Sequence, residues 1–587
     1  MRKAGLCVGA ALVLAALAAA GPISARPTST PATGRYIVIA KSSSDYAALQ
    51  NDLAKAGQKV VLSLPDVNAS VIVTTAKAPS VAAVASNAHV KTVVPDRIET
   101  IVPPNLKQEL LGPSQTRYQI TKKQGMLTAD PAFSLGGLLW NVKRIDDPAA
   151  LKVTTGHGIT VGVADTGLDY THLELHHQVS SVVDFTQEED PVICNPDDHH
   201  LAAMLGAPAD DLDFNGHGSW IGGNIAAELN GTGINGTAPG VSLVSLKISG
   251  WCGSAYDSTI IHAFLYAASH GIDVVSISFG GYLDRSDHDQ DAIYGLYEDA
   301  VQTAHDHGTV IVAAAGNEHT EIGAGGLVLS HGILSVPPGG DDLFGLYEVP
   351  GGLPGVVDVS STNNITRGKS HSCPADAINA GGFSWCKPST DAHQPFGVGL
   401  QNQLTYYSNY GPRIDVAGPG GARKFNLPAA DRGGTPGWPY TGANSLFGGT
   451  STSDGYRAFE DFSITSNWAQ EIPCFTFTGF SQFPTDQCYS TIQGTSMATP
   501  HASAVLALIA ASHHQWRHNV DALVAQLKAT AEDVSGNKEP PVSDDTSPAD
   551  LTGAACPGGF CHLGGAAIPD SEAYGAGLVD ADEAVQP

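Results

Sequence analysis

Three side chains that together could activate a nucleophile lie at the ends of predicted elements. Asp165 ends the apolar run 159–164, His217 stands between two glycines, and Ser496 opens an apolar helix in Gly-Thr-Ser-Met-Ala-Thr-Pro-His-Ala, residues 494–502. Taken singly, they fit a turn former, a close backbone approach and a helix N-cap. Taken together, they supply a hydroxyl, an imidazole that accepts its proton, and a carboxylate that orients the imidazole. The set predicts covalent catalysis on Ser496.

Asn317 adds a group that can stabilise negative charge. It ends the run Ala-Ala-Ala-Gly-Asn at 313–317, just after another predicted strand. Its side-chain amide can donate a hydrogen bond to the oxygen that becomes negative in the transition state. The backbone N–H of Ser496, at a helix N-terminus, is a second donor that the helix dipole favours.

The elements that must position these residues alternate between strand and helix. Continuous Val/Ile/Ala strands bounded by glycine are typical of a parallel sheet covered on both faces, so we predict a doubly wound α/β fold. The predicted strands are 159–164, 242–248, 272–279, 309–315 and 356–360, and the predicted helices are 256–270, 291–307 and 496–512.

A smaller unit precedes this region. Strand and helix patterns over residues 35–102 give the order β-α-β-β-α-β, which is ferredoxin-like and α+β. The predicted strands are 35–40, 59–64, 70–75 and 91–94, with helices over 45–56 and 79–88. The polar, proline-containing stretch 104–137 has no clear period, and we interpret it as a linker.

The first 25 residues have the pattern of a secretory signal peptide. Met1-Arg2-Lys3 is followed by an Ala/Leu-rich run and by Ile-Ser-Ala at 23–25, which predicts cleavage after Ala25, or alternatively after Ala20. No later run has the length of a membrane span. We therefore expect a secreted, extracellular protein without a membrane partner once the signal is removed.

The charge balance excludes one class of function. The 587-residue chain has 30 Lys and Arg against 58 Asp and Glu, for a net charge of −28, and 42% of its residues are hydrophobic. Phosphate affinity needs clustered cations, so no nucleic-acid partner is expected. The hydrophobic fraction is enough for a large buried core.

The cysteines predict disulfides. One of the nine, Cys7, lies in the signal peptide, and the even number that remains is typical of an exported, disulfide-bonded chain. The sequence leaves many disulfide pairings open. Six of the eight cysteines form three couples that are close in sequence, and pairing within those couples would leave Cys194 to pair with Cys252. A zinc site is the alternative, although no matched Cys-x-x-Cys and His spacing is present. The predicted pairs are Cys194–Cys252, Cys373–Cys386, Cys474–Cys488 and Cys556–Cys561.

Through the Asp165, His217, Asn317 and 494–502 motifs the chain resembles the subtilisin-like (subtilase) family of secreted serine proteases. The resemblance extends over most of residues 140–587. It implies a subtilisin-like catalytic domain over 138–587, a serine endopeptidase activity on polypeptide substrates, and no cofactor for catalysis. Residues 34–103 resemble the family's inhibitor-type propeptide, which assists folding, blocks the cleft as an intramolecular inhibitor and is removed by the enzyme itself.

The resemblance also implies substrate-binding residues. Ser278, Phe279 and Gly280, continuing to Gly281, fall on the strand that pairs with substrate backbone, and Gly253 falls on the opposing rim. Glu318, directly after Asn317, either favours a basic or polar side chain in the specificity pocket or is a surface charge.

Two departures from the family pattern affect the surroundings of the site. Ser219-Trp220 replaces the usual Thr-His after the catalytic His-Gly, and His172-Leu-Glu-Leu replaces His-Pro-Asp-Leu. Glu174 and Asn230 fall where relatives hold a structural calcium ion, and oxygen ligands suit calcium. Metal sites at Asp197-Asp198-His199-His200 or at His172, His176 and His177 are weaker hypotheses, because solvated loop residues explain those runs.

Three insertions relative to minimal relatives are implied, near 178–214, 362–403 and 421–489. The second and third each contain one near cysteine couple, so each is expected to be closed by its own disulfide, which lowers the entropy of the unfolded chain. Cys194, in the first insertion, would reach Cys252 beside the substrate rim.

Other functions on the same residues are less well supported. A processing peptidase or peptide ligase is a variant in which specificity or the acyl acceptor differs. A non-catalytic scaffold would need no complete triad, and a lipase or esterase would favour Gly-x-Ser-x-Gly around its serine. Catalysis should fall in acid as His217 is protonated, since imidazoles ordinarily titrate near ~6.5.

Overall fold

A computed structural model describes most of the chain. It covers residues 34–74, 79–100, 139–186, 193–231, 233–330, 342–363, 402, 404–405, 407–421, 464–469, 475–476, 479–480, 488–534 and 568–587. The predicted signal peptide and the linker 104–137 lie outside these residues, as do nearly all of 362–403 and most of 421–489. Among the described helices, none is long and apolar enough to span a membrane.

A seven-stranded parallel sheet organises the larger domain. Its order is β15-β14-β12-β10-β6-β8-β7, and every neighbouring pair is parallel. This arrangement confirms the predicted α/β class. The strands are β6 (Thr160–Asp165), β7 (Val179–Asp184), β8 (Ser242–Lys247), β10 (Val274–Ile277), β12 (Val310–Ala314), β14 (Val356–Thr362) and β15 (Val416–Pro419).

Helices cover both faces of this sheet, as a doubly wound fold requires. One apolar cluster joins the sheet to α8, α12, α13 and α16, and a second joins it to α9 and α10. The helix α12 is buried along almost its whole length, which explains why its sequence is apolar on every side. These helices are α8 (His217–Ala226), α9 (Asp257–Ser269), α10 (His288–Asp306), α12 (Thr495–Ser512), α13 (Val520–Ala529) and α16 (Ala581–Val585).

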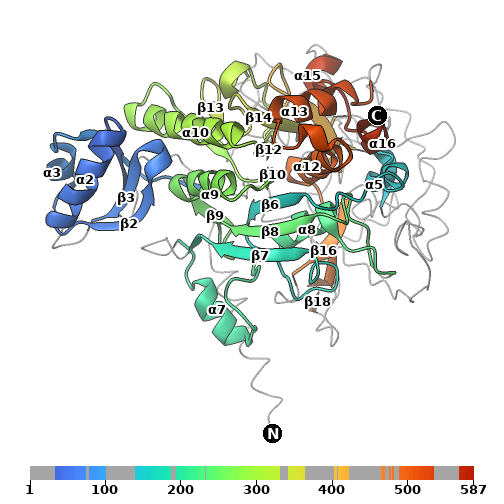
Figure 1. Cartoon of the computed structure of the whole chain (residues 1–587), viewed down its shortest axis with the longest axis horizontal. Helices are drawn as coiled ribbons and strands as arrows, with labels where there is room; N and C mark the ends of the chain where they lie inside the picture. Colours follow the sequence, from blue (N-terminus) through green and yellow to red (C-terminus); the bar gives the residue numbers. More distant parts are fainter. Residues whose placement is uncertain are drawn as a thin grey trace, which may run out of the picture.

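Residues 34–74 and 79–100 form the smaller unit, with the predicted element order. Its antiparallel sheet has the order β2-β3-β1-β4. Side chains of β1 alternate, so that Val38 packs under the unit's own helices while Ile37 and Ile39 join the cluster containing α9 and α10. Figure 1 shows this unit, in blue, beside α10. Its elements are β1 (Arg35–Ala40), α2 (Ser43–Lys55), β2 (Lys59–Leu64), β3 (Ala69–Val73), α3 (Val81–Ala85) and β4 (Val90–Pro95).

Shorter elements surround the sheet. The predicted insertion 178–214 begins with β7, which is an edge strand of the sheet, and then contains α7 (Asp198–Leu205), drawn below β7 in Figure 1. The sequence did not predict β7, α7 and β15, nor the helices α8, α13 and α16. The remaining helices and strands are β5 (Ile98–Thr100), β9 (Ser254–Tyr256), β11 (Gly281–Leu283), β13 (Tyr347–Val349), β16 (Ile464–Trp468), β17 (Phe475–Thr476), β18 (Gly479–Phe480), β19 (Cys488–Ile492), α5 (Trp140–Arg144), α6 (Asp147–Ala150) and α15 (Asp570–Tyr574).

Candidate active site

Asp165 and His217 form a buried pair at the carboxyl edge of the sheet. Asp165 is the last residue of β6, and His217 is the first residue of α8. The Nδ1 atom of His217 lies 2.9 and 3.0 Å from the two carboxylate oxygens of Asp165, and each side chain is 1% exposed. Because an ionised carboxylate only accepts hydrogen bonds, Nδ1 carries the proton in this pair and Nε2 keeps a lone pair. That tautomer is the one a general base needs.

The polar residues behind this pair fix the first turn of α8. The Thr166 N–H donates to Asp165 Oδ1 at 2.8 Å, and its hydroxyl donates to Asp213 Oδ1 at 2.9 Å. Asp213 also accepts hydrogen bonds from the N–H groups of Gly216 and Ser219. A carboxylate at this position satisfies amides that a helix N-terminus leaves without intrahelical partners. Asp213 was not predicted as a functional residue, although an Asp shortly before Asn-Gly is a recognisable turn signal.

Ser496 lies at the start of α12, over the ends of β10 and β12. The ring of Pro500 has no N–H to donate to the Ser496 carbonyl four residues earlier. That carbonyl instead accepts a hydrogen bond from Ser278 Oγ at 3.3 Å, just after β10. Ser496 itself is 3% exposed. Since β12, β10 and β6 are neighbours, the sheet places Ser496 and the Asp165–His217 pair along one edge.

Asn317 is attached to the same helix start. Its Oδ1 accepts hydrogen bonds from the backbone N–H and the hydroxyl of Thr495, at 2.9 and 3.0 Å. With its oxygen fixed in this way, the amide NH₂ is the group left to act as a donor. A Cβ built on Gly494 would lie 3.6 Å from Ser496 N and 3.8 Å from Asn317 Oδ1. Gly494 has φ 155° and ψ 161°, a region that glycine alone adopts readily, so the backbone conformation before Ser496 depends on glycine rather than on the space around it.

Glu318 lies beneath Asn317 and is partly buried. Its Oε2 accepts hydrogen bonds from the Tyr282 hydroxyl at 2.7 Å and from the Asn317 N–H at 2.8 Å. Burial raises the pKa of this carboxyl, and the hydrogen bonds from Tyr282 and Asn317 oppose that shift. Asn409 supports the same turn, because its Oδ1 accepts from the backbone N–H of Glu318 and of Thr320.

The predicted substrate rims flank a strand of the smaller unit. Gly253 makes a turn at φ 71°, and the β9 strand after it pairs antiparallel with β5. Arg97, next to β5, donates from Nη2 to the Tyr282 carbonyl at 3.2 Å, on the β11 side. Phe279 is buried and Gly280 is exposed. An extended segment of the chain therefore already contacts both rims.

The two predicted calcium ligands, Glu174 and Asn230, come from two loops that are hydrogen-bonded to each other. Glu174 is fully buried, and its Oε1 accepts the Ile234 N–H at 3.0 Å. Its carbonyl accepts the Glu228 N–H, two residues before Asn230. The donor set, a carboxylate beside a loop of carbonyl and amide oxygens, has the chemistry that calcium prefers.

The two weaker metal hypotheses have different outcomes in the structure. Asp197 caps α7 and pairs with His200, Asp198 pairs with Lys247, and His199 pairs with Asp210, so that run is split among separate partners. Asp198 and His172 are buried, and the interpretation of them as solvated residues was wrong. His176 and His177 instead lie with Glu228, with one ligand atom of each within 4.8 Å of the others.

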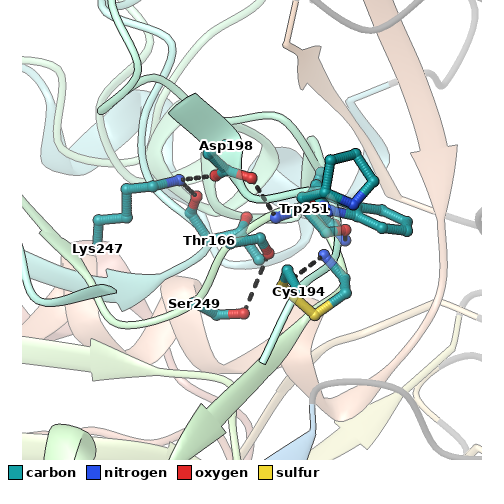
Figure 2. The surroundings of a disulfide bond; sticks show 10 residues. Thr166, Cys194, Asp198, Lys247, Ser249 and Trp251 are labelled. Carbon is teal, nitrogen blue, oxygen red and sulfur yellow. Dashed lines mark hydrogen bonds and ion pairs between the residues drawn. A yellow bond between two sulfur atoms is a disulfide. The ribbon is translucent and has the colours of Figure 1, made fainter. Parts of the chain in front are cut away.

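One predicted disulfide falls within the described residues. Cys194 and Cys252 are bonded, with their Cα atoms 5.5 Å apart, and Figure 2 shows their surroundings. The side chains of the six cysteines in the other three predicted pairs, 373/386, 474/488 and 556/561, lie outside the described residues.

Comparisons with known proteins show which proteins this chain is similar to. A model of the subtilase family matches residues 156–546. The chain is 30% identical to an intracellular serine protease of Paenibacillus polymyxa over 201 residues, which cover 34% of this chain and 52% of that protein. It is 31% identical to thermitase of Thermoactinomyces vulgaris over 189 residues, covering 32% of this chain and 57% of thermitase. The chain thus matches about half the length of these relatives.

Two solved structures share the fold. The epidermin leader peptide processing serine protease of Staphylococcus aureus superposes with a TM-score of 0.54 at 18% identity, covering 94% of this chain and 98% of that chain. Fervidolysin of Fervidobacterium pennivorans superposes with a TM-score of 0.54 at 19% identity, covering 96% of this chain and 62% of that chain.

Proposed function

The chain belongs to the subtilase family, and on that premise we propose that it is a serine endopeptidase that hydrolyses peptide bonds through an acyl-enzyme on Ser496. The observation that carries the proposal is the buried Asp165–His217 hydrogen bond, at the same sheet edge as the start of α12. A hydroxyl becomes a competent nucleophile when a correctly oriented imidazole can accept its proton.

The proposed reaction uses the chain's own groups throughout. The Ser496 hydroxyl attacks the peptide carbonyl while His217 Nε2 takes its proton, and Asp165 stabilises the resulting imidazolium. Asn317 and the Ser496 N–H donate to the oxyanion. The C–N bond then breaks as His217 returns the proton to the leaving amine. Water attacks the ester with His217 as base, and the acid product leaves as Ser496 regains its proton.

The proposal includes synthesis as a zymogen, with residues 34–103 as the inhibitor segment. The β5 strand pairs with β9 as a substrate strand would, which favours occupation of the cleft by this segment. Its attachment is polar as well as apolar: Arg35 and Asp96, both fully buried, form an ion pair at 2.6 Å, and Asp96 accepts from the Ser258 hydroxyl. The signal-peptide pattern of residues 1–25 and the Cys194–Cys252 disulfide support secretion.

We extend the proposal to a preference for a basic side chain before the scissile bond. Glu318 lies beneath Asn317, and Glu348 is opposite Tyr282 in the β11–β13 pair, on the continuation of the 278–281 rim. Glu318 is the partly exposed carboxyl of the two, and its negative charge favours a cationic substrate group. In a series of peptide amides that differ only at this position, arginine should be cleaved fastest, and Glu318→Gln should reduce its advantage. Equal rates for arginine and leucine would contradict the preference.

We also propose a structural calcium ion at Glu174 and Asn230. Chelation should then lower the melting temperature, and added calcium should restore it. Glu174→Gln should lose this response, whereas chelation without effect on the wild-type chain would exclude the site.

Self-processing tests the main proposal. The chain from Arg26 onward would be produced as wild type and as Ser496→Ala, and the masses of both would be followed over time. We expect the wild type to lose the 35–102 region while the variant keeps it. Loss of the region in both proteins would show that another protease removes it and would contradict the zymogen proposal.

A further inference from the structure

A buried lysine lies directly beside the catalytic pair. Lys247 ends β8, where it is paired in register with Asp165 of β6, and its side chain is fully buried. Its ammonium donates to the carbonyls of Thr166, at 2.7 Å, and Leu212, at 2.9 Å. It also lies 2.8 Å from Asp198 Oδ2. An ammonium has three N–H donors, and these three acceptors use all of them.

The counter-charge comes from the inserted helix. Asp198 is the first residue of α7, and its other oxygen, Oδ1, accepts the Trp251 N–H at 3.0 Å. Figure 2 shows the carboxylate between Lys247 and Trp251, with the Thr166 carbonyl next to it at the ammonium. Asp213 and Asp184 also contribute negative charge near Lys247. Asp198 is the carboxylate in direct contact with the ammonium.

The disulfide fixes Asp198 in this position. Cys194 lies four positions before Asp198, and Cys252 directly follows Trp251. A Cβ on Gly250 would lie 3.1 Å from both Cys194 Sγ and Asp198 Oδ1, so both groups pack on this glycine. The Trp251 indole N–H also donates to the Pro196 carbonyl.

A second path runs from the disulfide to the histidine. The Trp251 carbonyl accepts a hydrogen bond from Asn215 Nδ2 at 2.8 Å. Asn215 Oδ1 in turn accepts the His217 N–H at 3.3 Å. Asp198 is therefore linked to the backbone on both sides of the catalytic pair, through Lys247 to Thr166, next to Asp165, and through Trp251 to Asn215, two residues before His217.

We propose that Asp198, held by the Cys194–Cys252 disulfide, is a positioning residue for the catalytic pair, because it neutralises Lys247 and so fixes the strand end that carries Asp165. The inference rests on the proposed function. Removal of one member of a buried ion pair leaves the other as an uncompensated charge. Without Asp198, the positive field of Lys247 acts on His217 and disfavours its protonated form.

The test is the rate at which an alkyl fluorophosphonate inactivates the full chain, measured from pH 5 to 9. We expect Asp198→Asn to slow inactivation about tenfold. The acid limb, where the rate of inactivation falls as the pH is lowered, should move to lower pH by on the order of half a unit. The matched control is Asp210→Asn, on the same insertion but partly exposed and paired with His199. It should match the wild type.

Two further variants separate positioning from a loss of structure. In Asp198→Asn with Lys247→Met, the uncompensated charge is gone, so the acid limb should return toward the wild-type position. Cys194→Ser with Cys252→Ser should shift the limb in the same direction as Asp198→Asn, by less. An acid limb in Asp198→Asn identical to that of Asp210→Asn, or a shift that persists in the Lys247→Met double variant, would overturn the proposal. A wild type that does not react with the probe would instead overturn the proposed function.

Discussion

The two ends of the candidate site are built on buried charge of different kinds. At the Asp165 end, the ammonium of Lys247 is balanced by Asp198 and two carbonyls. At the Asn317 end, three carboxyls, Glu318, Glu348 and Asp358, are partly or wholly buried.

A cation, Arg413, lies near these carboxyls and opposes the rise in the pKa of Asp358 and Glu348, but its direct contacts are with other groups. Arg413 pairs with Asp415 at 2.7 Å and donates to the carbonyls of Gly352, Leu353 and Val356. Burial raises the pKa of Asp358 to about 7, and burial with repulsion from Asp358 and Glu318 raises that of Glu348. One end therefore holds fixed, compensated charges, and the other holds carboxyls whose charge changes with pH. The buried ion pair at the Asp165 end therefore fixes the positions of the catalytic side chains, whereas the charge at the Asn317 end depends on the pH.

The largest predicted effect is at the fixed end. Asp165→Asn keeps the size of the side chain but stabilises the wrong tautomer of His217, so kcat should fall by about 10⁴-fold with little change in KM. Steady-state hydrolysis of a peptide amide measures both constants. A decrease of less than tenfold would mean that the hydrogen bond from His217 Nδ1 does not control catalysis.

At the other end, the predicted loss is smaller. Asn317→Ala removes one oxyanion donor, and kcat should fall about 10²–10³-fold, the range known for such a donor in subtilisin. The same assay applies. Since the donor acts in the transition state, a rise in KM at constant kcat would contradict its assignment.

The pH dependence of stability should separate the two ends. Burial favours protonated Asp358, so its contribution to the free energy of unfolding is present below pH ~4 and is lost as the pH rises through about 7. Asp358→Asn should therefore gain stability relative to wild type between pH 5 and pH 8, by a few degrees in melting temperature. Asp521→Asn, at a side chain that is 88% exposed, is the control and should show no such trend.

The smallest predicted effect lies at the edge of the fixed end. Asp197 caps α7 by accepting the His200 N–H at 2.8 Å. Asp197→Ala should cost about 0.5–2 kcal/mol of local helix stability. Hydrogen exchange in α7 should rise while kcat stays near the wild-type value, because Asp198 keeps its disulfide anchor. A loss of activity comparable to that of Asp198→Asn would mean that the helix cap is itself needed for positioning.

The fold was predictable where local sequence determines structure. The strands β6, β8, β12 and β14 are almost wholly buried, are rich in Val, Leu, Ile and Ala, and each begin one or two residues after a glycine. Predicted and observed ends differ by at most two residues for these four strands. The edge strand β7 was missed because its residues are only partly buried, so its sequence, Val-Ser-Ser-Val-Val-Asp, has no long apolar run.

The site was predictable in its reactive groups and not in their support. Asp165, His217, Asn317 and Ser496 stand in recognisable motifs. Lys247 is a single lysine at the end of an apolar strand, and its partner Asp198 is in an insertion 49 positions earlier in the chain. No local pattern joins them, because the contact exists only once the sheet has formed. The run from Asp197 to His200 was interpreted as a weak metal hypothesis for the same reason. Two of its ion-pair partners, Lys247 and Asp210, lie outside the run.

The most direct test of the proposed catalysis is to identify the residue that a fluorophosphonate modifies. The full chain, as wild type and as His217→Ala, would be treated with a fluorophosphonate, digested, and searched by mass spectrometry for the modified peptide. We expect an adduct on Ser496 in the wild type and a reaction slower by about 10²-fold or more in His217→Ala. An unlabelled wild-type Ser496, or labelling at the same rate in both proteins, would contradict it.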